Sequence, residues 1–131
     1  MTDRKIKVKR DEAAYVFRKY ARLGLDKRRL KPFEVYAVIK GVSKNEEEAM
    51  ELLAVYDTVR LLSMTSPEAI SALRAVYFFD KGRRPLKNQI GQRVLRFADE
   101  NCLDERTVYR RLKLVKETYY HLKRGADNEA Y

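Results

Sequence analysis

In the last third of the chain, apolar residues recur at alternating intervals of four and three positions. This spacing places their side chains on one side of an α-helix, which has 3.6 residues per turn. Asp104 precedes the stripe and is a good N-cap, and Gly125 follows it as a typical helix end. The sequence therefore predicts a long amphipathic helix whose buried side consists of Val108, Leu112, Val115, Tyr119 and Leu122.

Helix-forming sequence also fills the rest of the chain, which has 45% hydrophobic residues but only five Gly and three Pro. So few helix-breaking residues favour an all-α fold. We expect an N-terminal helical bundle followed by a C-terminal tri-helical helix-turn-helix unit. The expected division is a flexible basic N-terminus (1–10), an N-terminal helical region (11–64), a helix-turn-helix DNA-binding region (65–124) and a frayed tail (125–131).

Capping residues divide the chain into individual helices. Ser43 is followed three residues later by Glu46, the pattern of a capping box. Pro32 and Pro67 suit the first turn of two further helices, because proline lacks the N–H group that is left unpaired there. The expected boundaries are a helix start at Asp11, N-caps at Ser43, Thr65 and Asp104, ends at Gly24, Ser63 and Phe79, a helix over Leu86–Glu100 and a turn at Asn101–Leu103.

The charge of the chain is strongly positive and unevenly distributed. The 29 Lys and Arg residues exceed the 19 Asp and Glu residues, which gives a net charge of +10. The net charge is +8 over residues 1–40, −3 over residues 41–79 and +5 over residues 80–131. A small globular protein with this excess usually binds a polyanion. Two basic clusters can bind phosphates or merely be solvated, and both interpretations stay open for them: Lys5, Lys7, Lys9, Arg10 and Lys27, Arg28, Arg29, Lys31.

The stretch from Val94 to Lys116 resembles a helix-turn-helix in its pattern of small and bulky residues. Ala98 provides a small residue where two helices can touch, and Cys102 is a small residue where this motif often has Gly. Leu103 then supplies the apolar residue that follows the turn. Asn101 and Arg111 depart from the usual pattern, since apolar residues are common at their positions. A generic helical hairpin remains the alternative interpretation.

The helix after Asp104 carries cations on the side opposite its apolar stripe. We call Arg106, Arg110 and Lys113 the basic face. Arginine can bind the O6 and N7 atoms of guanine, and threonine can contact the methyl group of thymine. Glu117 lies further along the same side and would repel phosphates, so DNA contact should end before it. The predicted base-reading residues are Arg106, Thr107, Tyr109, Arg110 and Lys113, and the predicted phosphate-binding residues are Arg83, Arg84, Lys87 and Arg93.

No pattern of residues predicts an enzyme, a metal site or a cofactor. The chain has one histidine, His121, and one cysteine, Cys102, nineteen residues before it. This spacing indicates neither a metal cluster nor a Cys–His catalytic pair. Cys102 cannot form an intrachain disulfide, and no apolar run is long enough to span a membrane. We therefore expect a cytoplasmic, non-enzymatic protein without a membrane partner.

Two segments of the chain resemble one known family. They are AMELLAVYDTVRLLSMTSPEAISALRAVYFF and IGQRVLRFADENCLDERTVYRRLKLVKETYYHL, within residues 48–122. They look like the ArpU/RinA-type phage regulators, whose C-terminal part resembles the promoter-reading helix-turn-helix of sigma-factor region 4. The resemblance is carried by Ala72–Tyr77 and by Thr107–Lys113. It implies a transcription factor that activates late genes of a phage or prophage in a bacterial host.

The leading hypothesis is a sequence-specific regulator that binds double-stranded DNA and reads its major groove with the helix after Asp104. RNA polymerase is the protein partner that such an activator would contact, and a homodimer is left open. One alternative is a small terminase-like protein of phage DNA packaging, which also places a helix-turn-helix on DNA. Another is a helical adaptor that binds RNA polymerase without reading DNA.

Overall fold

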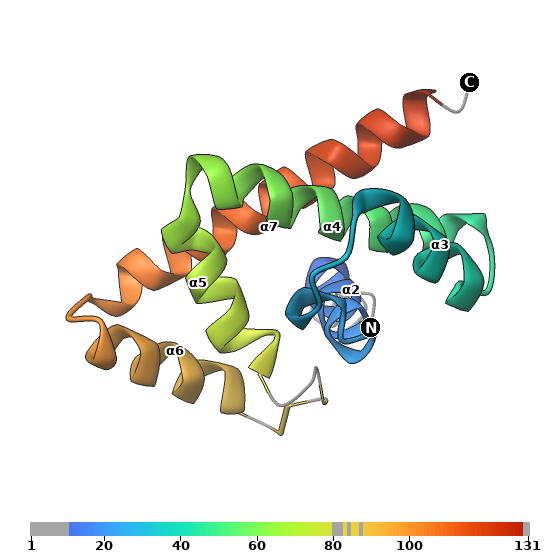
Figure 1. Cartoon of the computed structure of the whole chain (residues 1–131). Helices are drawn as coiled ribbons and strands as arrows, with labels where there is room; N and C mark the ends of the chain where they lie inside the picture. Colours follow the sequence, from blue (N-terminus) through green and yellow to red (C-terminus); the bar gives the residue numbers. More distant parts are fainter. Residues whose placement is uncertain (1–10, 80–82, 84, 87, 130–131) are drawn as a thin grey trace, which may run out of the picture.

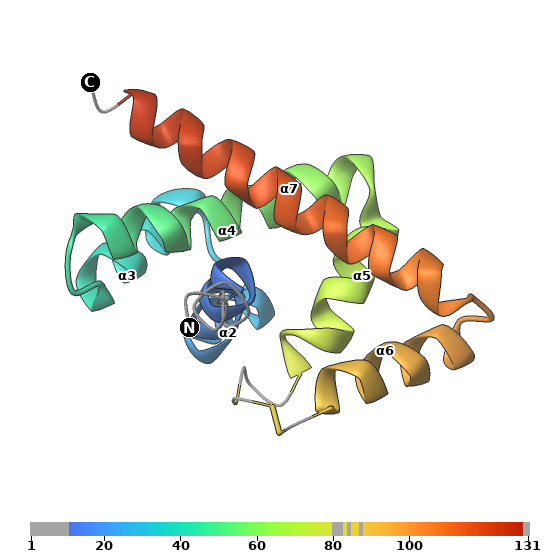
Figure 2. The same ribbon diagram turned by 180° about the vertical axis from the view of Figure 1, so that it is seen from behind.

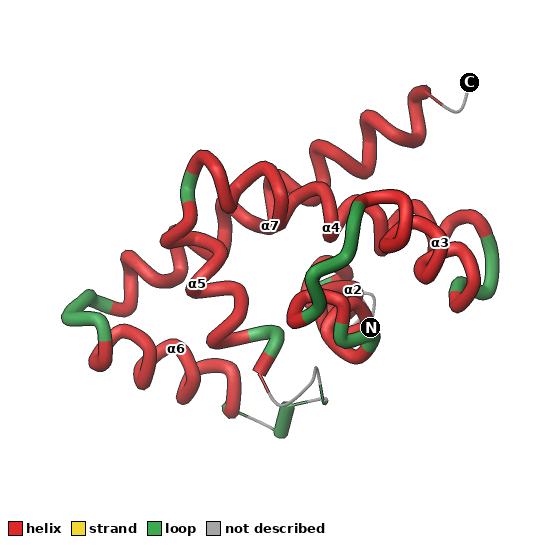
Figure 3. Tube along the Cα trace, viewed as in Figure 1, coloured by secondary structure: helices red, strands yellow, loops and turns green. Residues whose placement is uncertain are grey.

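The computed structural model describes residues 11–79, 83, 85–86 and 88–129, and the side chains of 126–129 are not described. These residues form helices without any strand among them, which confirms the predicted all-α class (Figure 3). In chain order the elements are α2 (Glu12–Arg22), the short 3-10 helix η1 (Leu25–Lys27), α3 (Pro32–Val42), α4 (Glu46–Thr65), α5 (Pro67–Val76), α6 (Gln89–Glu100) and α7 (Glu105–Glu129). The basic segment 1–10 lies outside the described residues.

One predicted helix start, one predicted N-cap and one predicted helix end are confirmed. Asp11 caps α2, with its carboxylate accepting a hydrogen bond from the backbone N–H of Ala14 at 3.1 Å. Asp104 precedes α7 in the same way. Gly24 follows α2 with a φ of +71°, the left-handed conformation that glycine adopts without strain. Local side-chain chemistry therefore sets these boundaries as the sequence indicates.

The prediction that Ser43 caps the next helix is wrong. Ser43 instead ends α3, and its hydroxyl donates to the carbonyl of Ile39 one turn earlier. Asn45 is the cap of α4, because its side-chain oxygen accepts from the backbone N–H of Glu48 at 2.8 Å. The Ser43 hydroxyl is directed back to the preceding helix, and Asn45, which directly precedes α4, supplies the capping acceptor instead.

The prediction of a cap at Thr65 is wrong for the same reason. α4 runs through Thr65, whose hydroxyl donates to the carbonyl of Leu61, and Ser66 is the residue before α5. Pro67 occupies the first turn of α5, as predicted. The neighbouring ends also differ slightly from expectation, since α5 ends at Val76 rather than near Phe79, and α6 begins at Gln89 rather than at Leu86.

Gly125 does not end the last helix, as was expected, because α7 continues to Glu129. A glycine inside a helix costs only about 1 kcal/mol relative to alanine, so one glycine need not stop a long helix. Residues 125–129, which were expected to belong to the tail, are therefore part of α7. Residues 130–131 lie outside the described part of the chain.

α7 is the element around which the other helices are arranged (Figures 1 and 2). Its first half, residues 105–115, packs with α5 and α6, whereas its second half, residues 116–129, runs past α4. α6 lies at one end of the molecule and α3 at the other in both views. The two predicted regions are thus joined by one continuous helix.

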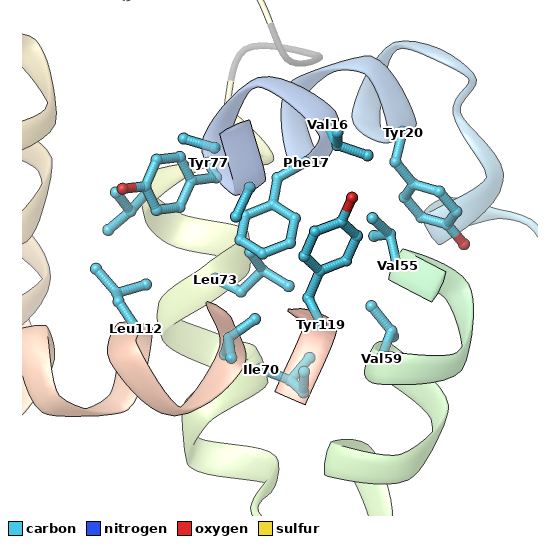
Figure 4. Close-up of a cluster of buried hydrophobic side chains, with 14 of the residues drawn as sticks. Val16, Phe17, Tyr20, Val55, Val59, Ile70, Leu73, Tyr77, Leu112 and Tyr119 are labelled. Atoms are coloured by element: carbon cyan, nitrogen blue, oxygen red, sulfur yellow. The ribbon is translucent and has the colours of Figure 1, made fainter. Parts of the chain in front are cut away.

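A single hydrophobic core lies where α2, α4, α5 and α7 meet (Figure 4). Phe17 of α2 is fully buried, and its ring packs edge-on against Tyr77 after α5 and Tyr119 of α7, with centroids 5.8 and 5.6 Å apart. Such edge-to-face aromatic pairs add to the effect of burial alone. The core therefore fixes the orientation of α7, which carries the predicted functional residues.

Candidate nucleic-acid interface

The turn between α6 and α7 has a specific hydrogen-bonding pattern. The N–H of Leu103 donates to the carbonyl of Ala98 at 2.8 Å, and the N–H of Cys102 donates to that of Asp99 at 3.3 Å. These two bonds form a Schellman motif, which ends a helix with one residue in the left-handed conformation. Cys102 is that residue, with a φ of +55°. The position where a helix-turn-helix often has glycine is thus the one that needs a positive φ.

Asn101 explains one of the two departures from the usual motif. Its side-chain amide donates to the carbonyl of Phe97 at 2.8 Å and so satisfies an acceptor at the end of α6. Asn101 is exposed and therefore gains nothing from being apolar. Arg111, the other departure, is half-buried at the side of α7.

Asp104 orders the first turn of α7. Its carboxylate accepts from the backbone N–H of Thr107 at 2.7 Å. This bond, with a further contribution from the Thr107 hydroxyl and the charges of Arg106 and Arg110, holds the pKa of Asp104 below its usual range. The start of α7 is therefore pre-formed and does not depend on a ligand.

The predicted buried stripe of α7 is confirmed. Val108 and Val115 are fully buried, Leu112 and Tyr119 are nearly so, and Leu122 is half-buried. The helical phase assigned from the sequence is therefore correct. It follows that residues half a turn away from this stripe must face outward.

The basic face does lie outward. Arg106, Arg110 and Lys113 are exposed, and the ion pairs recorded for the described residues involve none of them. Tyr109 beside them is 47% exposed, whereas Thr107 is half-buried. The structure thus brings the predicted base-reading residues together on the first half of α7. Glu117 is exposed further along this side, as expected.

The predicted phosphate-binding residues do not form one set. Arg83 is exposed, while Arg84 and Lys87 lie outside the described residues. Arg93 is only 9% exposed, and its Nη1 donates to the carbonyl of Val76 at 2.9 Å. Its guanidinium also lies over the ring of Phe79, 4.8 Å from the centroid. Arg93 therefore fastens α6 to the end of α5, and the expectation that it contacts phosphate is wrong.

Arg96 is the cation on α6 that the sequence argument missed. It is exposed and lines a hollow of about 200 Å³ together with Gln89 and Gln92. The sequence contains the signal that would have identified it. Val94 and Ala98 define the buried side of α6, and Arg96 is two residues from each. A helical phase taken from these two residues places Arg96 outward and Arg93 at the side.

The second basic cluster forms an exposed surface of its own, away from the basic face. Lys27, Arg28, Arg29 and Lys31 are all exposed and lie in and after η1, just before α3. Lys5, Lys7, Lys9 and Arg10 fall outside the described residues.

The described residues offer little basis for other chemistry. Within them no group of three or more His, Cys, Asp or Glu side chains is placed to hold a metal ion. None of the described helices combines the length and the apolar character that crossing a membrane requires.

Comparison with protein-family models, curated proteins and solved structures found no match to the chain. Function must therefore be inferred from the residues themselves.

Proposed function

We propose that this protein is a sequence-specific regulator of transcription that inserts the first half of α7 into the major groove of double-stranded DNA. The observation that carries the proposal is the basic face, three exposed cations that form no ion pair with the described residues, on a helix whose opposite side is buried. Cations gathered on one exposed side of a helix can neutralise several phosphates at once, and the release of counterions then favours binding. The protein as a whole has the matching net charge of +10.

The dimensions of the basic face suit a short run of base pairs. Arg106 and Lys113 are seven residues apart, about 10 Å along a helix, which corresponds to roughly three base pairs at about 3.4 Å each. Arg106 and Arg110 can each bind a guanine through two hydrogen bonds, and Tyr109 can contact a base or sugar at the edge. Glu117 marks the end of this contact because its carboxylate repels phosphate.

Phosphate contacts would come from the α6 side of the same unit. Arg83 and Arg96 are exposed there, and Arg84 and Lys87, which lie outside the described residues, stay predictions from the sequence. Asp99, Glu100 and Glu105 are exposed around the α6–α7 turn, so the sugar–phosphate backbone should avoid that corner.

The biological role rests on the resemblance of residues 48–122 to phage late-gene regulators. It supports an activator of phage or prophage late genes, for which RNA polymerase is the natural protein partner. We propose no catalytic activity and no cofactor, since α7 supplies hydrogen-bond donors and charge rather than a nucleophile or a paired acid and base.

The test starts with selection of bound duplexes from random sequences, followed by salt titrations with the selected and scrambled duplexes. Arg110→Ala should weaken binding to the selected site by about 1–3 kcal/mol, roughly 5- to 150-fold, and relax preference at one base pair. Arg124→Ala is the matched control, because Arg124 is exposed on the same helix beyond Glu117 and should leave binding unchanged. Equal binding by wild type and both Arg106→Ala and Arg110→Ala would refute base reading by α7.

Phosphate contacts give a different signature in the same titrations. Arg96→Ala should weaken binding to selected and scrambled duplexes alike and lower the slope of affinity against salt by about one ion. A protein that binds no DNA at low salt would instead favour the adaptor hypothesis. Ring-shaped assemblies on DNA would favour the terminase-like one.

A further inference from the structure

Four exposed cations lie in and after η1, in the connection between α2 and α3. They are Lys27, Arg28, Arg29 and Lys31, which we call the η1 cluster. The ion pairs recorded for the described residues involve none of them. The proposed function makes no use of these cations, because they belong to neither α6 nor α7.

The backbone that carries the η1 cluster is held at both ends. The N–H of Arg28 donates to the carbonyl of Leu25 at 3.1 Å, and the N–H of Lys31 donates to the carboxylate of Glu34 at 2.9 Å. Between them Leu30 packs against the hydrophobic core. Arg28 and Lys31 have extended backbone conformations, in the loop that leads into α3 (Figure 3). The cations are thus presented to solvent from a stretch of chain with a defined shape.

The carboxylates near the η1 cluster do not cancel its charge. Both oxygens of Asp26 accept hydrogen bonds from Arg74, at 2.9 and 3.1 Å. Glu34 is half-buried. Asp57 on α4 is also half-buried, and an exposed arginine one turn later offsets its charge. Residues 22–34 together with Arg74 have six cations and two carboxylates, so a clear positive excess remains.

A hollow adjoins the Lys27 end of the η1 cluster. It has a volume of about 280 Å³ and lies between the end of α2, η1 and the half-buried ring of Phe78 after α5. Gly24 lines it without a side chain that could fill it. The charged residues that line it are Arg22, Asp26 and Lys27. A hollow of this size can take one flat ring system, but it is smaller than most pockets for drug-sized ligands.

A second aromatic ring lies at the other end of the η1 cluster. Phe33 follows Lys31 by two residues and is 67% exposed. The cations therefore have an aromatic ring at each end. Proteins that bind single-stranded nucleic acids combine cations that follow the phosphate backbone with aromatic rings on which the bases stack. Duplex DNA would supply phosphates for the cations but no unpaired base for either ring.

We propose that the η1 cluster binds a single strand of nucleic acid, with its phosphates along Lys27–Lys31 and unpaired bases against Phe78 and Phe33. The four cations extend over at most about 14 Å of chain, which is more than one phosphate group occupies, so the ligand is a strand rather than a free nucleotide. This inference goes beyond the proposed function and does not depend on it, since no residue of α7 belongs to the site.

The test must separate this site from the basic face. The protein used therefore has Arg106→Ala and Arg110→Ala in every sample. Binding of a labelled single-stranded oligonucleotide of about ten nucleotides is followed by fluorescence anisotropy over a range of salt concentrations. This background should keep its affinity for the strand, whatever it loses on duplex DNA. Loss of strand binding in this background would assign it to α7 and overturn the proposal.

Removal of charge from the cluster should have a defined effect on the salt dependence. Arg28→Ala with Arg29→Ala should weaken strand binding at least about tenfold and lower the slope of log affinity against log salt by about 1.4, because each phosphate neutralised on a single strand contributes about 0.7. Lys40→Ala with Lys44→Ala is the matched control, since both are exposed cations at the other end of α3. Equal effects of the two double variants would mean that only net charge matters, and would overturn the site.

Stacking is tested by combining a protein variant with an abasic strand. Phe33→Leu should weaken binding to the normal strand about 5- to 150-fold, the range measured for loss of one stacked base. On an abasic strand of the same length, Phe33→Leu and its parent should bind equally, because no base is left to stack. Ala21→Trp fills the hollow with a half-buried residue's side chain and should give the same pattern. Equal losses on both strands would show that the rings do not contact bases.

Competitors identify the kind of ligand. An unlabelled single strand should displace the labelled one at least about tenfold better than a duplex of the same sequence or a nucleoside monophosphate. Strands of DNA and of RNA are both tried, and the stronger competitor identifies the natural source, since the 2′-hydroxyl is the main difference between them. Equal competition by the duplex would reduce the cluster to a general phosphate-binding surface, and equal competition by the monophosphate would make the hollow a small-molecule pocket. Vesicles of phosphatidylcholine and phosphatidylserine that displace the strand more strongly than unlabelled strand does would assign the surface to a membrane. Each of these three results would overturn the proposal.

Discussion

The two halves of α7 both carry cations, but the cations have different surroundings. In the second half Lys116 forms an ion pair with Asp11 at 2.5 Å, and Lys123 forms one with Glu51 at 3.7 Å. In the first half Arg106, Arg110 and Lys113 face solvent without a recorded ion pair among the described residues. The same helix therefore uses its charges for internal contacts at one end and leaves them available at the other.

Burial accounts for this difference. Burial by itself lowers the pKa of Lys116, but the hydrogen bond that Lys116 donates to Asp11 and the influence of Tyr77 outweigh it, so the pKa lies above the ordinary value. A partly buried cation needs such partners, because leaving it unpaired is costly. The cations of the basic face are exposed and have no comparable need. They form no ion pair with the described residues, which is compatible with stability and leaves them available to a ligand.

The apolar side of α7 should matter most for stability, and Leu112 provides the largest expected effect. Leu112→Ala should lower the free energy of unfolding by about 2–5 kcal/mol, because Leu112 is 4% exposed and packs in the core. Leu114→Ala, at a residue 38% exposed on the same half of α7, should cost far less. Thermal melts measure both. Equal loss in the two variants would mean that the first half of α7 is not anchored as described.

Removing one cation from each half of α7 tests the comparison between the two halves directly. Arg106→Ala should weaken binding to a selected DNA duplex by about 1–3 kcal/mol and leave the melting temperature unchanged. Lys116→Ala should do the reverse, lowering the melting temperature while leaving DNA affinity unchanged, because it removes the ion pair with Asp11. If both variants change the same property, the two halves of α7 do not have separate roles.

The sequence predicts the part of this site that depends on helical phase. The stripe from Val108 to Tyr119 and the exposure of Arg110 both follow from 3.6 residues per turn, and both are correct. Arg93 was misassigned because it was judged by charge alone. The helical phase of α6 places it at the side, but its contacts with the carbonyl of Val76 at the end of α5 and with the ring of Phe79 after α5 cannot be read from the local pattern.

A helix start could be predicted from the sequence only where the side chain before the helix can form one kind of hydrogen bond. Asp11 and Asp104 each bond the backbone ahead of them, and both were identified correctly. Ser43 and Thr65 bond backward to the carbonyl of the preceding turn instead. A hydroxyl can donate or accept, whereas a carboxylate can only accept, so the two serine and threonine caps were ambiguous in a way that the aspartate caps were not.

A mutation in the turn between α6 and α7 should make the protein more stable. Cys102 has a φ of +55°, which costs an L-residue about 1–2 kcal/mol. Cys102→Gly should remove this strain. It also gives the unfolded chain more conformational entropy, which costs about 0.4–1 kcal/mol of stability, so the net gain in the free energy of unfolding should be about 0.5–1 kcal/mol. Denaturant titration would show it. Cys102→Ala should retain DNA binding, and Cys102→Val should be less stable than wild type, since a β-branched residue tolerates positive φ poorly.

The smallest expected effect concerns the pH dependence of the cap of α7. The pKa of Asp104 lies below its ordinary value of 3.8, chiefly because Thr107 donates to its ionised form. A lowered pKa in the folded state means that ionisation favours folding above the ordinary pKa, and that this contribution disappears as the pH falls through the folded-state value.

Asp104→Asn keeps an acceptor oxygen but cannot ionise. Its melting temperature should therefore lie below that of wild type at neutral pH, and the two should converge below about pH 3.8. Asp57 provides a contrast of opposite sign, because burial raises its pKa and its ionised form therefore opposes folding as the pH rises. Asp57→Asn should accordingly melt above wild type at neutral pH, again with convergence in acid. A gap between Asp104→Asn and wild type that stays constant from neutral pH to below pH 3.8 would show that the charge of Asp104 contributes nothing, and that only its hydrogen-bonding oxygen orders the start of the basic face.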